Sequence, residues 1–333
     1  MKKNIFKEIE SGFVFDNTKG LLNSSNEIIA ELSDINDSKR AIIKLTHYYY
    51  KKYYSKSQTL NKADDFQEIS IETDKEFINR LIKIFPNKKI ISSGWRVVSI
   101  VSKDILRVEK NGITLTVNTH LHFPKDLKIT KIHVNDIISI LFSCHFPNIS
   151  NGFYVFKSEI GEIDKTRGIG RFYFNANYNY VVDFTEEILS NLYNNNIIFD
   201  FKVFKNIRNE YRIDSAVLYF SLEDFEIIRK IISLLSNNEL YFNKEVSMFH
   251  HFVSNGVGFA EEPTMKKENE SYGLNRCRIL SEITFNSLDD IKKNGKIPWH
   301  KFDEQFKYYQ LDFNNIFLNP QSRMKKLLNL QNN

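Results

Sequence analysis

The chain has 333 residues, of which 42% are hydrophobic and 26% are charged, and this composition is typical of a folded globular protein. Its 46 basic and 41 acidic residues leave a formal net charge of +5, which is too small an excess to indicate nucleic-acid binding. Disordered and fibrous classes are therefore excluded, and the length predicts one large domain or two intertwined ones.

The cysteines and the start of the chain bear on its cellular compartment. Cys144 and Cys277 lie far apart and belong to no CxxC pair, so they predict neither a disulfide framework nor a zinc ribbon. Lys7 and Glu8 interrupt the apolar stretch that a signal peptide would need. No apolar run approaches the ~20 residues that span a bilayer. We therefore expect a cytoplasmic protein with no membrane partner.

The first elements in chain order are helical. Apolar residues recur at helical spacing through most of residues 1–90, which predicts a helical N-terminal region. The period changes to two in the next segment, and residues 91–160 are predicted to form a small antiparallel, β-rich subdomain. The pair Asn111-Gly112 between two of its strands is typical of a hairpin turn.

Strands and helices alternate in the remaining region, residues 161–333. Strands are predicted at 171–176, 199–204 and 212–220, and a helix at 181–193. Ser221 with Asp224 resembles a capping box and predicts the start of another helix. The fold class is therefore α+β, and the three regions are expected to form one intertwined unit.

A cationic side chain lies within the first of these strands. By the period-two rule Arg171, Tyr173 and Asn175 share one face of the strand. The opposite face carries Phe172 and Phe174, which are expected to enter the core. The ordinary interpretation is a solvated sheet face, and for any single residue it is the more common one.

The next two strands continue this pattern. Lys202 lies between Phe201 and Val203, and so it is expected on the face opposite the core. Arg212 and Asp214 are expected to open the following strand together. Several such cations on neighbouring strands favour a binding site over an ordinary exposed face.

A further block combines a Gly-x-Gly turn at 255–263 with a helix start that bears Arg276 and Arg278. Helix N-termini attract anions, and an arginine adds a bidentate fork for phosphate. The two arginines point in different directions, and Arg276 lies nearer the helix start, so it is the preferred ligand. Its ordinary interpretation is a surface salt bridge to Glu270 or Glu282.

The common catalytic motifs are absent from the sequence. It contains no GxxxxGK[ST] loop, GxGxxG, HExxH or GxSxG pattern. His120 and His122 would share a strand face, but no third ligand stands at close spacing, and we expect no metal site and no cofactor. One residue of the pair His250-His251 is positioned to enter a cleft.

Six blocks of the sequence, in this order, resemble the HopA-type domain. They are GWRVVSI (94–100), PNISNGFYVF (147–156), GRFYFNAN (170–177), YRIDSAVLYF (211–220), NGVGFAEEP (255–263) and SYGLNRCRILSE (271–282). That family includes type III effectors of plant pathogens and the lyase components of class V lanthipeptide pathways. The tyrosine-rich stretch at 48–54 resembles the helical N-terminal part of the family.

The resemblance implies a phosphothreonine or phosphoserine lyase. Enterobacterial phosphothreonine lyase effectors carry a Lys-Phe-His strand, a lysine about 30 residues later, then an arginine and a tyrosine. The similar positions here are Arg171-Phe172-Tyr173, Lys202, Arg212 and Tyr219. Tyr173 stands where those effectors have histidine.

These residues suit the elimination of phosphate. Lys202 would remove the Cα proton as a neutral amine, and neighbouring arginines would lower its pKa from the ordinary value of about 10.4. Arg171, Arg212 and Arg276 would hold the phosphate dianion, so no metal is needed. Tyr173 would donate a proton to the leaving group. Secondary candidates for the site are Asp214, Tyr219, Arg278 and His250.

Two hypotheses remain open at this point. The first is a lyase that converts phosphorylated Thr or Ser of a precursor peptide into dehydrobutyrine or dehydroalanine in lanthipeptide-type biosynthesis. The chain has no HRD or DFG signature, so a separate kinase protein would supply the phosphate. The alternative is a non-catalytic phosphopeptide-binding or host-targeting effector domain. Nucleic acid is the least favoured partner.

Overall fold

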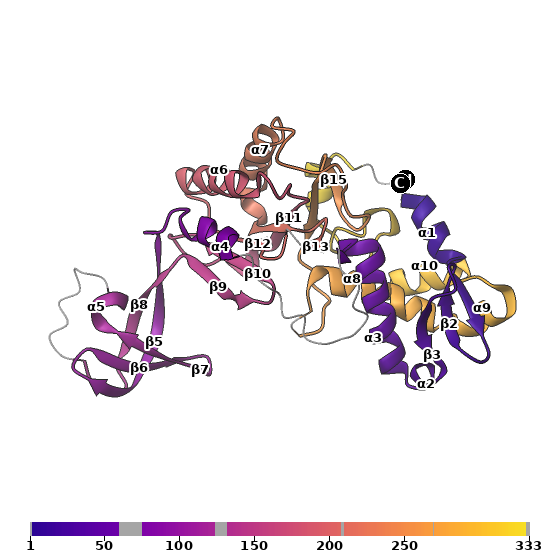
Figure 1. The fold of residues 1–333 in the computed structure, drawn as a ribbon, viewed down its shortest axis with the longest axis horizontal. Coiled ribbons are helices and arrows are strands. Elements are labelled where there is room, and N and C mark those ends of the chain that lie inside the picture. Colours follow the sequence, from indigo (N-terminus) through magenta and orange to yellow (C-terminus); the bar gives the residue numbers. More distant parts are fainter. Residues whose placement is uncertain (1, 60–74, 124–131, 208–209, 269, 331–333) are drawn as a thin grey trace.

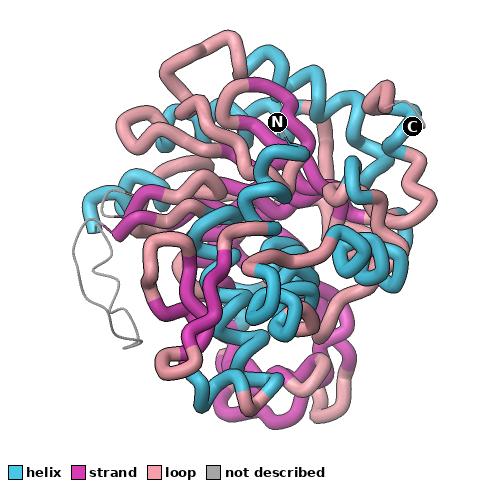
Figure 2. Tube along the Cα trace, turned by 90° about the vertical axis from the view of Figure 1, so that its right-hand side faces the viewer, coloured by secondary structure: helices cyan, strands magenta, loops and turns pink. Residues whose placement is uncertain are grey.

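The computed structural model describes residues 2–59, 75–123, 132–207, 210–268 and 270–330. Helices and antiparallel sheets share the chain, which confirms the α+β prediction. A central body carries a smaller β-rich subdomain that projects from one end (Figure 1). The first and last described residues lie on the same side of the body, away from that subdomain (Figures 1 and 2).

The N-terminal region mixes helices with a small sheet. Its helices are α1 (Lys2–Glu10), α2 (Leu32–Ile35), α3 (Ser38–Tyr49) and the π-helix η1 (Tyr50–Ser55). Its three-stranded sheet comprises β1 (Phe13–Asp16), β2 (Gly20–Asn23) and β3 (Ile28–Glu31). Helical spacing did not predict this sheet, because strands of four residues are too short to display a clear period of two.

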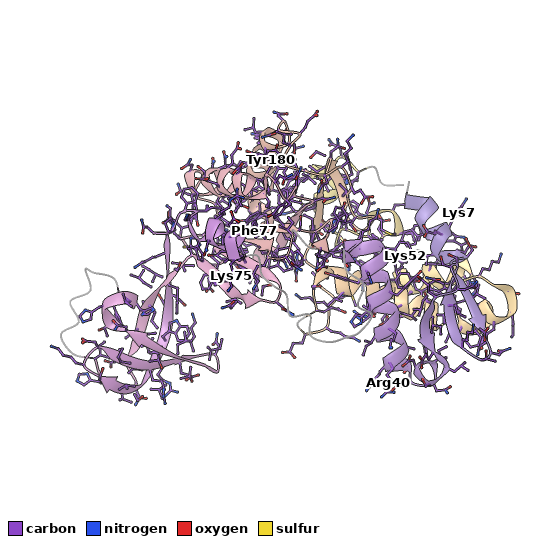
Figure 3. All side chains as sticks on the ribbon, in the orientation of Figure 1. Lys7, Arg40, Lys52, Lys75, Phe77 and Tyr180 are labelled. Atoms are coloured by element: carbon purple, nitrogen blue, oxygen red, sulfur yellow. The ribbon has the colours of Figure 1, made fainter. Side chains whose placement is uncertain are left out.

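The projecting subdomain is a four-stranded sheet in the order β7-β6-β5-β8. Its elements are β5 (Lys89–Ser102), β6 (Ile105–Lys110), β7 (Ile113–Asn118), α5 (Thr119–His122) and β8 (Ile137–Ser143). It has a hydrophobic core of its own, formed by Trp95, Val97, Leu106, Val108, Val117, Phe123 and Ile140. Helix α4 (Lys75–Ile82) precedes it and packs on the body through buried Phe77, whose ring lies 6.2 Å from that of Tyr178 (Figure 3).

The hairpin turn in this subdomain is confirmed. Asn111 and Gly112 join β6 to β7 with φ angles of 51° and 77°, as a type I′ turn requires. The expected strand through His120 and His122 is wrong, because these residues form the short helix α5. The Asn118 side chain accepts a hydrogen bond from the His120 N–H at 2.9 Å and so caps that helix.

The central body is built on a seven-stranded antiparallel sheet, in the order β15-β16-β11-β14-β12-β10-β9. The strands are β9 (His145–Ser150), β10 (Phe153–Lys157), β11 (Ile169–Phe174), β12 (Phe199–Phe204), β14 (Ala216–Ser221), β15 (His251–Ser254) and β16 (Val257–Glu261). A separate two-stranded pairing joins β4 (Gln58–Thr59) to β13 (Glu210–Tyr211).

Helices α6 (Val181–Asn194) and α7 (Phe225–Leu235) cover one face of this sheet. The Phe172 ring stacks on Phe225 at 5.8 Å, and Phe174 lies 5.0 Å from Phe184. The face of β11 that carries Phe172 and Phe174 was predicted to enter the core, and this prediction is confirmed. Short 3-10 turns precede β11 and α7: η2 (Lys165–Arg167) lies before β11 and η3 (Leu222–Asp224) lies before α7.

The opposite face lies under η1 and α8 (Tyr272–Phe285). The Tyr54 ring contacts Tyr173 edge-on at 6.3 Å, and Tyr272 lies 5.9 Å from Tyr173. The remaining C-terminal elements are α9 (Leu288–Asn294), α10 (Trp299–Tyr308), η4 (Phe313–Asn315) and α11 (Met324–Leu327). None of the helices in the described ranges combines the length and apolar character that crossing a bilayer requires.

The predicted strand at 212–220 starts later than expected. Strand β14 begins at Ala216, and Arg212 and Asp214 lie in the turn before it. The Ile213 N–H donates to the Ser55 carbonyl at 3.0 Å, so this turn is tied to η1 rather than to the sheet. The tertiary contact with η1 therefore replaces the first part of the strand.

Candidate functional site

Polar side chains form a row across four strands of the central sheet. Arg171 on β11 is paired in register with Tyr219 on β14, Tyr219 with Asp200 on β12, and Asp200 with Lys157 on β10. Paired residues of antiparallel strands point to the same face. All four side chains line a cavity of about 560 Å³.

The other walls of this cavity come from two loops beside β11. The segment that follows β16 supplies Glu262, Pro263, Thr264 and Lys266, and the segment before β11 supplies Glu162 and Lys165. Asn319 closes the cavity from the C-terminal region. The cavity thus contains basic and acidic side chains together, and its cations suit an anionic ligand.

Arg171 is a buried cation of the cavity that has several contacts with its neighbours. It is only 6% exposed, although it is an arginine on a strand. Its guanidinium forms an ion pair with Glu262, lies 4.6 Å from the centre of the Tyr219 ring and donates to the Tyr173 hydroxyl at 3.3 Å. Burial opposes the charge, but the neighbouring tyrosines hold its pKa above the ordinary value.

The side chain of Lys202 lies close to the Tyr219 ring. Its Nζ is 5.1 Å from the centre of the Tyr219 ring and 4.5 Å from that of Phe153. Its β12 neighbours Phe201 and Val203 are fully buried in the core, so the predicted orientation of Lys202 is confirmed. Among the described residues, Lys202 is not one of those that line the cavity.

Tyr219 is an ionisable group that lies between these two cations. Burial raises the pKa of its phenol, but Lys202 and Arg171 lower it, and the net pKa lies below the ordinary value of a tyrosine. The charge of the Lys202 side chain, whose Nζ lies close to the Tyr219 ring, favours the anion. A tyrosine that ionises easily on a cavity wall is a candidate acid–base group.

Tyr173 lies in a different environment. It is buried beneath Tyr54 and Tyr272, and its ring stacks on His250 with centroids 3.9 Å apart. Burial raises the pKa of Tyr173 to about 12. Among described residues it is not part of the cavity lining, and it reaches the cavity only through Arg171.

Arg212 and Asp214 form an ion pair with each other, close to Lys202. Two hydrogen bonds of 2.9 Å join the guanidinium to the carboxylate, and Arg212 also donates to the Tyr50 hydroxyl at 3.1 Å. Burial raises the pKa of Asp214, but the Arg212 charge outweighs it and holds the pKa below the usual range. Arg212 and Lys202 both contact the Phe153 ring, so this pair borders the cluster without lining the cavity.

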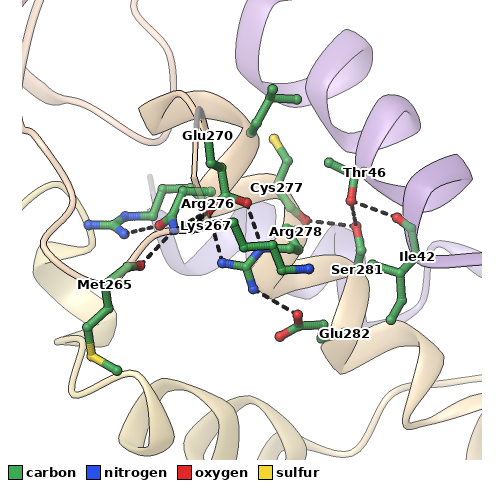
Figure 4. Close-up of polar contacts among 12 residues, drawn as sticks. Ile42, Thr46, Met265, Lys267, Glu270, Arg276, Cys277, Arg278, Ser281 and Glu282 are labelled. Atoms are coloured by element: carbon green, nitrogen blue, oxygen red, sulfur yellow. Dashed lines mark hydrogen bonds and ion pairs between the residues drawn. The ribbon is translucent and has the colours of Figure 1, made fainter. Parts of the chain in front are cut away.

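Arg276 and Arg278 lie on α8 with different partners (Figure 4). Arg278 pairs with Glu270 and with Glu282, the two carboxylates expected for Arg276. Arg276 instead donates from Nε to the Ile316 carbonyl at 2.7 Å and lines a crevice of about 10 Å³.

The three predicted phosphate ligands are therefore placed differently. Arg171 lines the large cavity, whereas Arg212 forms an ion pair with Asp214. Arg276 contacts Tyr272, and its guanidinium carbon lies 5.0 Å from the centre of that ring. Ring contacts link Arg276 to the site through Tyr272 and Tyr173. Burial lowers the pKa of Arg276 below the ordinary value of an arginine.

Several cavity residues were not among the sequence candidates. They are Lys157, Asp200, Glu262, Lys266 and Asn319. Asp200 carried a usable signal, since it shares the exposed face of β12 with Lys202 by the period of two. The others come from loops or strand ends whose position depends on the folded chain.

The described residues contain no group of three or more His, Cys, Asp or Glu side chains able to hold a metal ion. His120 pairs with Asp104 at 3.1 Å in the projecting subdomain, away from the cavity. The cavity lining itself supplies cations, carboxylates and the Tyr219 phenol.

Comparison with known proteins identifies relatives of the chain. The model of the family described as the HopA1 effector protein family matches residues 144–316. An effector protein from Pseudomonas syringae pv. tomato strain DC3000 has a solved structure that is 15% identical, covers 87% of this chain and 100% of its own, and gives a TM-score of 0.46. An effector from Pseudomonas syringae pv. syringae strain 61 is 11% identical, with coverages of 86% and 98% and a TM-score of 0.48. Comparison with curated proteins finds no match.

Proposed function

Because the chain belongs to the HopA1 effector protein family, we propose that it is a lyase that eliminates phosphate from phosphothreonine or phosphoserine in a peptide. The observation that carries this proposal is Tyr219, which lies on the cavity wall between two cations, Lys202 and Arg171. A base and a cation beside one cavity are what the elimination of phosphate requires.

In the proposed reaction the Cα proton leaves to a base and the Cβ–O bond breaks. The electron pair of the C–H bond becomes the new Cα=Cβ bond, and phosphate departs with the electrons of the C–O bond. The products are dehydrobutyrine from phosphothreonine or dehydroalanine from phosphoserine. Arg171 stabilises the charge of the departing phosphate.

Lys202 is the proposed base, acting together with Tyr219. A Lys202 ammonium beside a Tyr219 phenolate and a neutral amine beside a phenol differ only in which of the two groups holds one proton. Either form has room for one proton, and the lowered pKa of Tyr219 makes this state accessible at lower pH than for an isolated tyrosine. Tyr173 contacts the cavity residue Arg171 through a hydrogen bond and is proposed as an auxiliary proton donor.

The proposed pathway is lanthipeptide-type biosynthesis. A separate kinase protein phosphorylates the precursor peptide, and this chain then removes the phosphate, without metal or cofactor. We place the reaction in the cytoplasm, where the buried free thiols of Cys144 and Cys277 stay reduced.

The test is the mass of a phosphothreonine peptide after incubation with the protein, since elimination removes one phosphoric acid. Lys202→Ala is expected to lower the rate by about 10²-fold to 10⁴-fold, the usual worth of a general base. Tyr173→Phe should cost less than about tenfold, because Arg171 already stabilises the leaving group. Addition of a chelator should leave the rate unchanged.

Circular dichroism of both variants controls for folding. Full activity in Lys202→Ala would remove the base assignment, and a Tyr173→Phe loss as deep as that of Lys202→Ala would show that protonation of the leaving group limits the reaction. The second candidate function, a phosphopeptide-binding or host-targeting effector domain without turnover, is favoured by the buried position of Tyr173. An unchanged peptide mass together with tight binding would support it.

A further inference from the structure

One carboxylate of the protein already occupies the cationic part of the cavity. Glu262 forms ion pairs with both Arg171 and Lys266. The side chains of Arg171 and Glu262 are only 8% and 16% exposed, so this contact is largely shielded from water. Glu262 therefore lies where an anionic ligand of Arg171 would bind.

The backbone holds Glu262 in this position. Its N–H donates to the Ile169 carbonyl at 2.9 Å, and the Asn319 side chain donates to its carbonyl at 2.7 Å. The first of these bonds continues the pairing of β16 with β11 by one residue. The side chain of Glu262 can thus rotate away while its main chain stays in place.

The charges at this point are not balanced. Two cations share one carboxylate, and burial together with the Arg171 charge lowers the pKa of Lys266 below its ordinary value. The buried Nε of Arg171 has no hydrogen-bond partner among the described residues. A phosphate dianion brings a second negative charge and three acceptor oxygens, which a carboxylate lacks.

We propose that Glu262 determines the specificity of the site: its carboxylate holds the place of the substrate phosphate, and only a dianionic phosphate monoester displaces it from Arg171 and Lys266. The proposal rests on the proposed function for its choice of ligand. A monoanionic ligand offers these cations the same charge as Glu262, which has the advantage of being attached to the chain. Glu262 therefore excludes acidic side chains and phosphodiesters from a cavity that would otherwise attract them.

The experiment compares three peptides of the same sequence by calorimetric titration. One carries a phosphonate in which carbon replaces the ester oxygen of phosphothreonine, so that it cannot be eliminated. The second carries the methyl ester of that phosphonate, and the third carries glutamate. The unmodified protein is expected to bind the first and to reject the other two.

In Glu262→Gln all three peptides should bind more tightly, and the two monoanionic ones should gain at least about tenfold, in line with one charge-assisted hydrogen bond. Lys266→Gln should weaken binding of the phosphonate by about tenfold. Glu268→Gln and Lys267→Gln change the same charges at exposed positions of the same loop and should leave all three affinities unchanged.

Unchanged or weaker binding in Glu262→Gln, with melting equal to that of the unmodified protein, would overturn the proposal. If Glu262→Gln melts at a lower temperature than the unmodified protein, the Lys266→Gln variant is the deciding test. A phosphonate affinity of Lys266→Gln equal to that of Lys267→Gln would overturn the proposal. The phosphonate is not a substrate, so this result is independent of the mass test of turnover. A specificity change in a protein that never eliminates phosphate would refute the lyase and retain the role of Glu262.

Discussion

Tyr219 shows at the scale of a single residue how neighbours set reactivity. Arg171 and Lys202 face it from the adjacent strands β11 and β12 and lower its pKa, while Asp214 acts in the opposite direction. Tyr173 on the adjacent strand β11 and Tyr54 on η1 are buried without such an excess of positive charge, and their pKa values are raised. The same side chain thus becomes a stronger or a weaker acid according to its place on one sheet face.

We expect Tyr219 to ionise below the ordinary tyrosine pKa of about 10. Ultraviolet absorbance of the phenolate should therefore show one early step as the pH rises. Lys202→Met removes a positive charge that stabilises the anion, so it should move this step to higher pH. Tyr219→Phe should abolish the step, and its persistence in that variant would assign it to another tyrosine.

At the scale of elements, the close approach of η1 to α8 covers the cluster. Gly273 is the second residue of α8, and a Cβ there would lie 2.5 Å from Cε1 of Tyr54. Glycine is therefore required by the contact with η1 and not by the helix, where it is unfavourable. Ser271 accepts the Leu274 N–H at 3.3 Å and starts the helix at this point.

The effect of Gly273→Ala on the stability of the protein is accordingly expected to change sign when Tyr54 is removed. With Tyr54 present, overpacking costs about 1–3 kcal/mol and exceeds the gain of about 1 kcal/mol in helix propensity, so the protein is destabilised. In a Tyr54→Ala background only the propensity gain remains, and the same substitution should stabilise. Denaturant unfolding of the four proteins measures both values. Equal effects in the two backgrounds would show that the ring does not limit the approach.

For the whole molecule, the existence of two hydrophobic cores is the main feature. The body has one continuous core that joins the N-terminal region, the central sheet and the C-terminal helices. The projecting subdomain has a separate core of its own. We therefore place the division at the start of β5 and the end of β8, whereas the predicted region 91–160 also contains β9 and β10, which belong to the central sheet. The subdomain contributes no residue to the described lining of the cavity.

Leu106→Ala should weaken the subdomain selectively. Truncation of this side chain, which is 2% exposed, is expected to cost about 2–5 kcal/mol. Hydrogen exchange should then become faster in β5 to β8 and stay slow in β11 and β14, with elimination activity retained. Leu218→Ala, in the fully buried centre of the large sheet, is the matched control and should show the reverse pattern. Joint acceleration of both regions in Leu106→Ala would mean that they unfold as one unit.

The sequence by itself determined the features that depend on local periodicity. The faces of β11 and β12, the Asn111-Gly112 hairpin and the helix near 181–193 follow from the spacing of apolar residues and from turn chemistry. Arg171 and Lys202 were candidates for the same reason, whereas Tyr219 was a candidate only through the resemblance to a family.

Only the tertiary structure decided which of these residues meet. The pairing of β11, β14, β12 and β10 in register brings Tyr219 between Arg171 and Lys202, and no local pattern specifies that register. The late start of β14 after Arg212, the covering of Tyr173 and the ion pair of Arg171 with Glu262 each depend on a contact between distant segments. Such contacts follow from the packing of the whole chain, because burial and charge pairing act on neighbours in space rather than in sequence.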